Sequence, residues 1–135
     1  MSSAAQMLKT YPRSFNLDAD LLAQATDALL ECAQACTACA DACLAEDDVA
    51  ALVKCIRTNL DCADICDATM RVVSRQTEYD ANVTRAQLQA CAQACKSCGD
   101  ECQQHAQHGM EHCRVCADAC RRCGDACHRL IDAIA

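Results

Sequence analysis

Aromatic residues, glycine and proline are all scarce in this sequence. Its 135 residues include one Phe, two Tyr and no Trp, together with three Gly and one Pro. Few residues therefore break a helix, and a fold of short strands joined by tight turns is disfavoured. The length is that of one domain with a modest core. Because the hydrophobic 53% consists largely of Ala and Cys, that core must be unusual.

Long apolar runs and an excess of positive charge are also missing. No stretch approaches the roughly 20 apolar residues that span a bilayer, so we expect no membrane association. The net charge of −7 argues against a nucleic-acid partner. Residues 1–15 contain no apolar segment of the kind found in secretory signals. The protein is therefore expected in the cytoplasm, where disulfides are rare.

What the sequence has in abundance is cysteine, with 16 residues. Most neighbouring cysteines are three or four positions apart, a spacing that places side chains along one face of an α-helix. Such stripes on several helices can face one another and line a shared interior. The cysteines are Cys32, Cys36, Cys39, Cys43, Cys55, Cys62, Cys66, Cys91, Cys95, Cys98, Cys102, Cys113, Cys116, Cys120, Cys123 and Cys127.

The chain divides into an N-terminal lead-in, residues 1–16, and a cysteine-lined helical domain, residues 17–135. The predicted fold class is all-α: an antiparallel up-down-up-down four-helix bundle with a cysteine-lined core and a short N-terminal helical segment. Connections between the long helices are expected at residues 46–48, at residues 75–82 and around Gly109, a residue type that suits a helix end.

Three asparagines have predicted roles. Asn16 and Asn82 are the expected N-caps of the first and third long helices, since Asn is a preferred residue there. Asn59 lies where a cysteine would complete the ladder of the second helix, between Cys55 and Cys62. A buried Asn at this position must be satisfied by hydrogen bonds; a weak oxygen ligand is the alternative.

So many inward cysteines predict metal ligands rather than simple packing. Bundle cores normally reach close packing with Leu, Ile and Val. Disulfides between neighbouring cysteines of one helix are disfavoured, because their Cβ atoms are about 5–6 Å apart, whereas a disulfide needs roughly 3.8 Å. Thiolates favour Cu(I), Zn(II) and iron–sulfur clusters. One Cu(I) per thiolate cancels the buried charge, whereas Zn(II) in separate four-cysteine sites leaves about −2 per site. Multiple Cu(I) ions are therefore the predicted cofactor.

Two alternatives remain open: an iron–sulfur electron-transfer protein, and a zinc or general metallothionein-like metal buffer. The segment from Cys36 contains C-x2-C-x3-C, close to a ferredoxin spacing, but the full bacterial run and its proline are missing. Four C-x-x-C pairs also occur, yet a thioredoxin-type site needs a βαβ context that the pattern does not indicate. No paired carboxylates suggest a catalytic pocket, and we do not expect an enzyme.

With these motifs, residues 17–134 resemble the copper storage proteins, specifically their cytosolic branch that has no export signal. The repeated C-x3-C and C-x2-C steps on four helices, and the His and Met residues near one end, carry the resemblance. It implies a bundle that stores many Cu(I) ions through core thiolates, without catalysis, in a homotetramer. Copper ions are the expected partners, and a copper chaperone is the candidate protein partner.

The two ends of the predicted bundle differ. His105, His108, Met110 and His112 gather at the end that holds the first and third connections. We expect copper to enter at this His/Met end, and all four residues are candidate ligands. His105 is the foremost of them, since it continues the inward register three residues after Cys102. The opposite end is expected to hold an aliphatic plug, formed by Leu22, Leu29, Val73, Leu88, Leu130 and Ile134.

Overall fold

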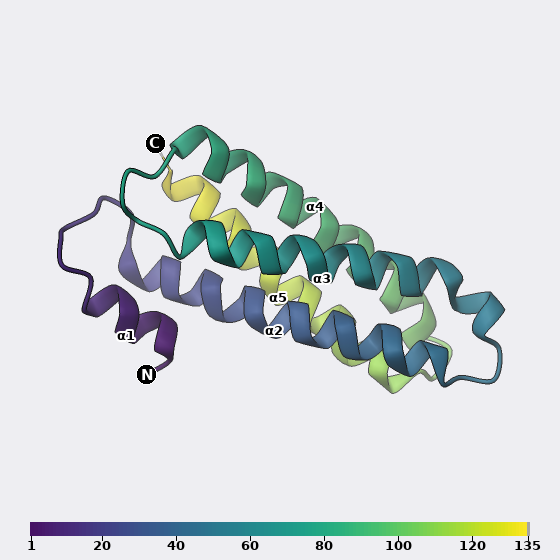
Figure 1. The fold of residues 1–135 in the computed structure, drawn as a ribbon. Helices are drawn as coiled ribbons and strands as arrows, with labels where there is room; N and C mark the ends of the chain where they lie inside the picture. The colour runs from purple at the N-terminus through teal and green to yellow at the C-terminus, as the bar shows by residue number, and fades with distance from the viewer. Residues whose placement is uncertain (135) are drawn as a thin grey trace.

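The structure is a computed structural model, and it describes residues 1–134. That part of the chain contains helices and no strand, and a short N-terminal helix precedes four long ones (Figure 1). None of these helices is both long and apolar enough to cross a membrane. The elements are α1 (Ser3–Lys9), α2 (Ala19–Leu44), the 3-10 helix η1 (Val49–Leu52), α3 (Val53–Val73), α4 (Ala81–Ala106) and α5 (Glu111–Ala133).

The four long helices run alternately up and down, which confirms the predicted antiparallel bundle (Figure 1). The α2–α3 and α4–α5 connections lie at one end, and the α3–α4 connection lies at the other. Helix α2 packs against α3 and α5, and α4 packs against the same two helices. Within the described residues, no Cα atoms of the diagonal pairs α2/α4 and α3/α5 approach within 8 Å. This square arrangement creates a central axis on which inward side chains from all four helices meet.

Both predicted N-caps are wrong, because a nearby aspartate caps each helix in place of the asparagine. Asp18, not Asn16, caps α2, and its Oδ1 accepts two backbone N–H hydrogen bonds at 2.8 and 3.0 Å. Asp80, not Asn82, caps α4 in the same way at 2.8 and 3.1 Å. The negative charge of aspartate also interacts favourably with the positive end of the helix dipole, an advantage that neutral asparagine lacks.

The connections at the His/Met end are short. One turn of 3-10 helix follows Asp48, whose side chain accepts a hydrogen bond from the N–H of Ala51 at 3.4 Å. Gly109 separates α4 from α5 and has a φ of 90°, a left-handed conformation that suits glycine. The helix end expected at Gly109 is therefore confirmed.

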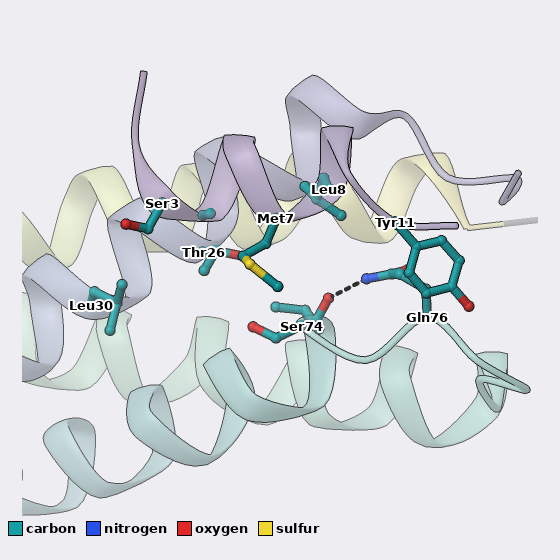
Figure 2. Close-up of a pocket in the computed structure, with 10 residues that line it drawn as sticks. Ser3, Met7, Leu8, Tyr11, Thr26, Leu30, Ser74 and Gln76 are labelled. Carbon is teal, nitrogen blue, oxygen red and sulfur yellow. Dashed lines mark hydrogen bonds between the residues drawn. The ribbon is translucent and has the colours of Figure 1, made fainter. Parts of the chain in front are cut away.

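Helix α1 lies against α2, beside the end of the bundle that holds the α3–α4 connection (Figure 1). The hydroxyl oxygens of Tyr11 and Thr77 are 2.7 Å apart, so a hydrogen bond joins the lead-in to that connection. A groove of about 270 Å³ lies between α1, α2 and the end of α3. Figure 2 shows side chains that line it, such as Met7 and Leu30. The lead-in is helical, as predicted, and its separation from residues 17–135 as a unit stays a prediction.

The core changes character along the bundle axis. At the end that holds the α3–α4 connection, each of the six residues expected to form the aliphatic plug exposes 7% or less of its surface. Beyond them, toward the His/Met end, the buried core consists mainly of cysteine. The plug and the thiol-lined section are thus consecutive parts of one interior.

Candidate metal centre

All sixteen cysteines are buried, and all have free thiols. None exposes more than 2% of its surface. They come from α2, α3, α4 and α5, so the stripes predicted from the spacing face one another across the bundle axis. The result is a thiol-lined tube, a name that we keep below for these sixteen side chains.

The sulfur atoms of the tube form a nearly continuous network. Cys36 on α2 has its Sγ within 3.7–3.9 Å of four other sulfurs, including those of Cys98 on α4 and Cys116 on α5. Cys66 on α3 is a second centre, with four sulfur neighbours at 3.7–3.9 Å, including Cys91 on α4. A chain of sulfur contacts connects the two centres. Cys32 contacts Cys36, Cys62 contacts Cys66, and the Sγ atoms of Cys32 and Cys62 are 3.9 Å apart.

These separations suit soft metal ions. With metal–sulfur bonds near 2.3 Å, two sulfurs on one ion lie about 3.8 Å apart in tetrahedral geometry and about 4.5 Å apart in linear geometry. Several groups of four sulfurs lie within 4.8 Å of one another, and the groups share members. Shared sulfurs can bridge neighbouring ions, so the tube can hold a connected cluster rather than isolated centres.

Asn59 interrupts the wall that α3 contributes. It is fully buried, and its Oδ1 accepts hydrogen bonds from the thiols of Cys98, Cys102 and Cys116 at 2.9, 3.3 and 3.4 Å. Its Nδ2 donates to the Sγ of Cys55 at 3.7 Å. The amide is thus satisfied by hydrogen bonds, as expected for a buried asparagine. The partners are the surrounding thiols, which the sequence pattern did not identify.

The ranking of His105 as the foremost histidine ligand stays a prediction, but the structure pairs this ring with a carboxylate. Its Nε2 lies 2.7 Å from the carboxylate of Glu101, one turn earlier on α4, and this pair engages the ring. The histidine that reaches the tube is His112, whose Nδ1 is 3.4 Å from the Sγ of Cys39 and 3.6 Å from that of Cys113. One signal was available in the sequence, because His112 precedes Cys116 by four residues and so continues its stripe.

The other two candidates occupy the rim at the same end. His108 is exposed in the connection after α4, whereas Met110 is partly buried, precedes α5 and packs against the core. Cys39, Cys43, Cys113 and His112 place their ligand atoms within 4.8 Å of one another. We call these four residues the mouth tetrad, because His112 keeps 26% of its side chain exposed to solvent.

Burial holds several thiols in their protonated, neutral form. It raises the pKa of the Cys43 thiol from 9.0 to about 12. Contacts with the sulfurs of Cys116 and Cys120, together with burial, raise the pKa of the Cys36 thiol above its usual range. A neutral thiol can be buried without the free-energy cost of removing a charge from water. This favours a bundle that folds before any metal binds.

We expect the metal-free protein to lose stability as the pH rises above about 9. The pKa of the Cys43 thiol is 9.0 in the unfolded chain and about 12 in the folded one. Between these values the folded state binds more protons, so the free energy of unfolding falls with rising pH; below this range both states are protonated. Thermal unfolding of the reduced protein under argon, measured from pH 7 upward, tests this. Cys43→Ala should make the fall of stability with pH less steep. The same dependence on pH in this variant would contradict the attribution of the fall to the raised pKa of Cys43.

A four-helix bundle whose interior is lined by free thiols is a container for soft metal ions. The copper storage protein family model matches residues 18–132, and this chain belongs to that family. No curated protein sequence matched in a separate comparison.

Solved structures give the same assignment. The Streptomyces lividans copper storage protein Ccsp, loaded with 10 copper equivalents, is 57% identical with a TM-score of 0.95, covering 97% of this chain and 99% of that one. A structure of the cytosolic Streptomyces lividans protein with five coppers is 60% identical with a TM-score of 0.84, and the match covers 86% of this chain and 96% of that one. Cu(I)-bound BsCsp3 is a Bacillus subtilis copper storage protein. It is 32% identical with a TM-score of 0.68, covering 78% and 93%.

Proposed function

We propose that this protein stores Cu(I) ions in the thiol-lined tube, at roughly one ion per thiolate. The observation that carries the proposal is the network of sixteen buried free thiols, with Sγ–Sγ contacts of 3.7–4.0 Å within and between helices. Monovalent copper cancels the charge of each thiolate that it binds, and bridging sulfurs link the ions. Family membership supports the same function and does not favour the iron–sulfur or zinc-buffer alternatives.

All sixteen cysteines are the proposed storage ligands. His112 is the proposed histidine ligand, since its Nδ1 faces two sulfurs. His108 and Met110 are proposed to capture ions at the rim, where soft sulfur and imidazole groups are suited to Cu(I). His105 is proposed as a weaker entry ligand, which must first leave Glu101.

Copper is proposed to enter at the His/Met end. The mouth tetrad lies there and is reached from solvent past His112, whereas Leu22, Leu29 and Leu130 close the far end with almost no exposed surface. An aliphatic plug offers no ligand to a metal ion. Ions therefore have a ligand path at one end of the tube only.

The cellular setting follows from the relatives. A Streptomyces lividans relative is described as cytosolic, and we propose a cytoplasmic, non-enzymatic storage role with a copper chaperone as delivery partner. A homotetramer is proposed from the family resemblance. The outer face of α2 and α3 supports it, because Leu30 and Leu60 are 48% and 46% exposed there beside small residues such as Ala33.

The storage function is tested by an anaerobic titration of the reduced protein with Cu(I) against a competing chelator. We expect saturation near one Cu(I) per thiol of the 16 present. Saturation at about four metal ions would instead indicate separate four-cysteine sites. A visible iron–sulfur chromophore in the purified protein would equally overturn the proposal.

A further inference from the structure

The side wall of the thiol-lined tube is thinnest between α3 and α4. These two helices make the least extensive contact among the four neighbouring pairs of long helices. A groove of about 230 Å³ lies between them, with Ile65 and Ala94 among its walls and Cys62 at its floor. We call it the lateral groove. Because Cys62 belongs to the tube, the lateral groove approaches the sulfur network from the side and not from either end.

The seam between α3 and α4 is tied on both sides of the lateral groove. Toward the plug, the side-chain amide of Gln87 donates a hydrogen bond to the hydroxyl of Thr69 at 2.9 Å. Toward the mouth, Nζ of Lys54 lies 4.0 Å from a carboxylate oxygen of Glu101. The lateral groove is thus a defined opening in the wall, with a limit at each end.

Polar side chains at the lateral groove do not join the two helices. Thr58, Asp61, Gln93 and Ser97 line it. The hydroxyl of Thr58 and the carboxylate of Asp61 form hydrogen bonds within α3, and the amide of Gln93 donates to Ser97 within α4. Sparse packing of this kind lowers the free energy needed for a local opening.

The floor of the lateral groove leads directly to other sulfurs. The Sγ of Cys62 lies 3.8 Å from that of Cys66, 3.9 Å from that of Cys32 and 4.0 Å from that of Cys95. These four ligand atoms form one group within 4.8 Å. A copper ion held by this group is therefore next to the lateral groove.

We propose that the lateral groove binds a small cationic aminothiol, which removes Cu(I) from the tube. The inference rests on the proposed storage function. The volume is below the roughly 300–1,000 Å³ of sites for drug-sized ligands, which favours a small molecule, and a soft sulfur is the group that competes for Cu(I). Asp61 supplies the negative charge for the amine, since its ion pair with Arg57 is exposed and such pairs are weak.

The exchange transfers copper without a change of oxidation state. The incoming sulfur forms a bond to Cu(I) as the bond between copper and the Cys62 sulfur breaks, and the proton of the incoming thiol passes to that sulfur. Because Cys62 exposes none of its surface in the closed bundle, the exchange follows a local opening of the seam. The incoming thiol brings its own ligand atom, so this exit is compatible with copper entry at the His/Met end.

The first test uses the metal-free, reduced protein and aminoethyl methanethiosulfonate, a small cationic reagent. It forms a mixed disulfide with a thiol as methanesulfinate leaves. We expect Cys62 to be labelled faster than Cys123 on the diagonal helix α5, as measured by mass spectrometry of peptides. Filling the lateral groove with Ala90→Leu and Ala94→Leu should slow the labelling of Cys62. Ala86→Leu is the matched control, since Ala86 is exposed and lies one turn before Ala90, outside the lateral groove.

The second test follows copper release from the loaded protein to an excess of a bulky anionic Cu(I) chelator, with and without cysteamine. Cysteamine should accelerate release from the parent and from Ala86→Leu, and this acceleration should be lost when the lateral groove is filled. Mercaptoacetate, an anionic thiol, should accelerate release less. Asp61→Asn should remove this preference for cysteamine, whereas Asp64→Asn, in the groove between α2 and α3, should keep it.

Circular dichroism checks the helices of each variant, and Ala90→Leu alone, at an exposed position, serves as the milder filling variant. Equal labelling of Cys62 and Cys123, or a cysteamine effect that survives filling of the lateral groove, would overturn the proposal. The number of Cu(I) ions bound before cysteamine is added reports on storage. The labelling result needs no metal, so failure of the lateral groove and failure of the storage function are distinguished.

Discussion

A variant with Cys36, Cys98, Cys116 and Cys120 changed to alanine should keep its helices and bind about four fewer Cu(I) ions than the parent protein, since each thiolate accounts for about one ion. These four ligand atoms form one group within 4.8 Å, contributed by α2, α4 and α5. Alanine removes only the sulfur and favours helix. The anaerobic Cu(I) titration used for the parent protein measures the change.

The control for this variant is Thr37→Ala with Ser97→Ala. Both residues are exposed; Thr37 on α2 directly follows Cys36, and Ser97 on α4 directly precedes Cys98. The control should saturate at the parent value, because its side chains point away from the tube. An unchanged capacity in the four-cysteine variant would mean that copper binds somewhere other than the thiol-lined tube.

Leu130→Ala should have the largest effect on stability, about 2–5 kcal/mol in the free energy of unfolding of the metal-free protein. Leu130 on α5 is fully buried in the aliphatic plug, where the lost methyl groups leave a cavity that the neighbouring helices cannot close completely. Urea unfolding followed by circular dichroism measures the difference.

Val115→Ala is the matched control on the same helix, since Val115 is 51% exposed and should change stability by no more than about 0.5 kcal/mol. The copper capacity of Leu130→Ala should equal that of the parent under conditions in which it is folded. A loss of capacity would show that the plug section takes part in binding, and a negligible loss of stability would show that it is not closely packed.

Helix number, the inward faces and the position of the plug could be predicted from the sequence, because each depends on periodicity within one helix. Steps of three and four residues place Cys32, Cys36, Cys39 and Cys43 on one side of α2 whatever surrounds it. The helix starts were less predictable. Asp18 and Asp80 lie two residues from Asn16 and from Asn82 respectively, and both residue types are favourable caps.

The candidate site was predictable in composition but not in detail. The histidines illustrate why: His105 and His112 both lie near the end of a cysteine stripe, and sequence spacing ranks His105 first. In the structure Glu101 pairs with His105 within α4, whereas His112, in the first turn of α5, lies close to Cys39 on α2. Contacts between helices cannot be read from spacing along one of them.

Sixteen thiols in helical stripes, few large apolar side chains among them, and aliphatic residues at one end all follow from the order of the amino acids. The packing of the helices, by contrast, sets which sulfurs from different helices come within 4 Å, makes Asn59 an acceptor for three thiols, and brings three cysteines to His112 and Glu46 at the mouth. The physical reason is that periodicity is a local property of the chain, whereas ligand geometry depends on the relative rotation and height of packed helices.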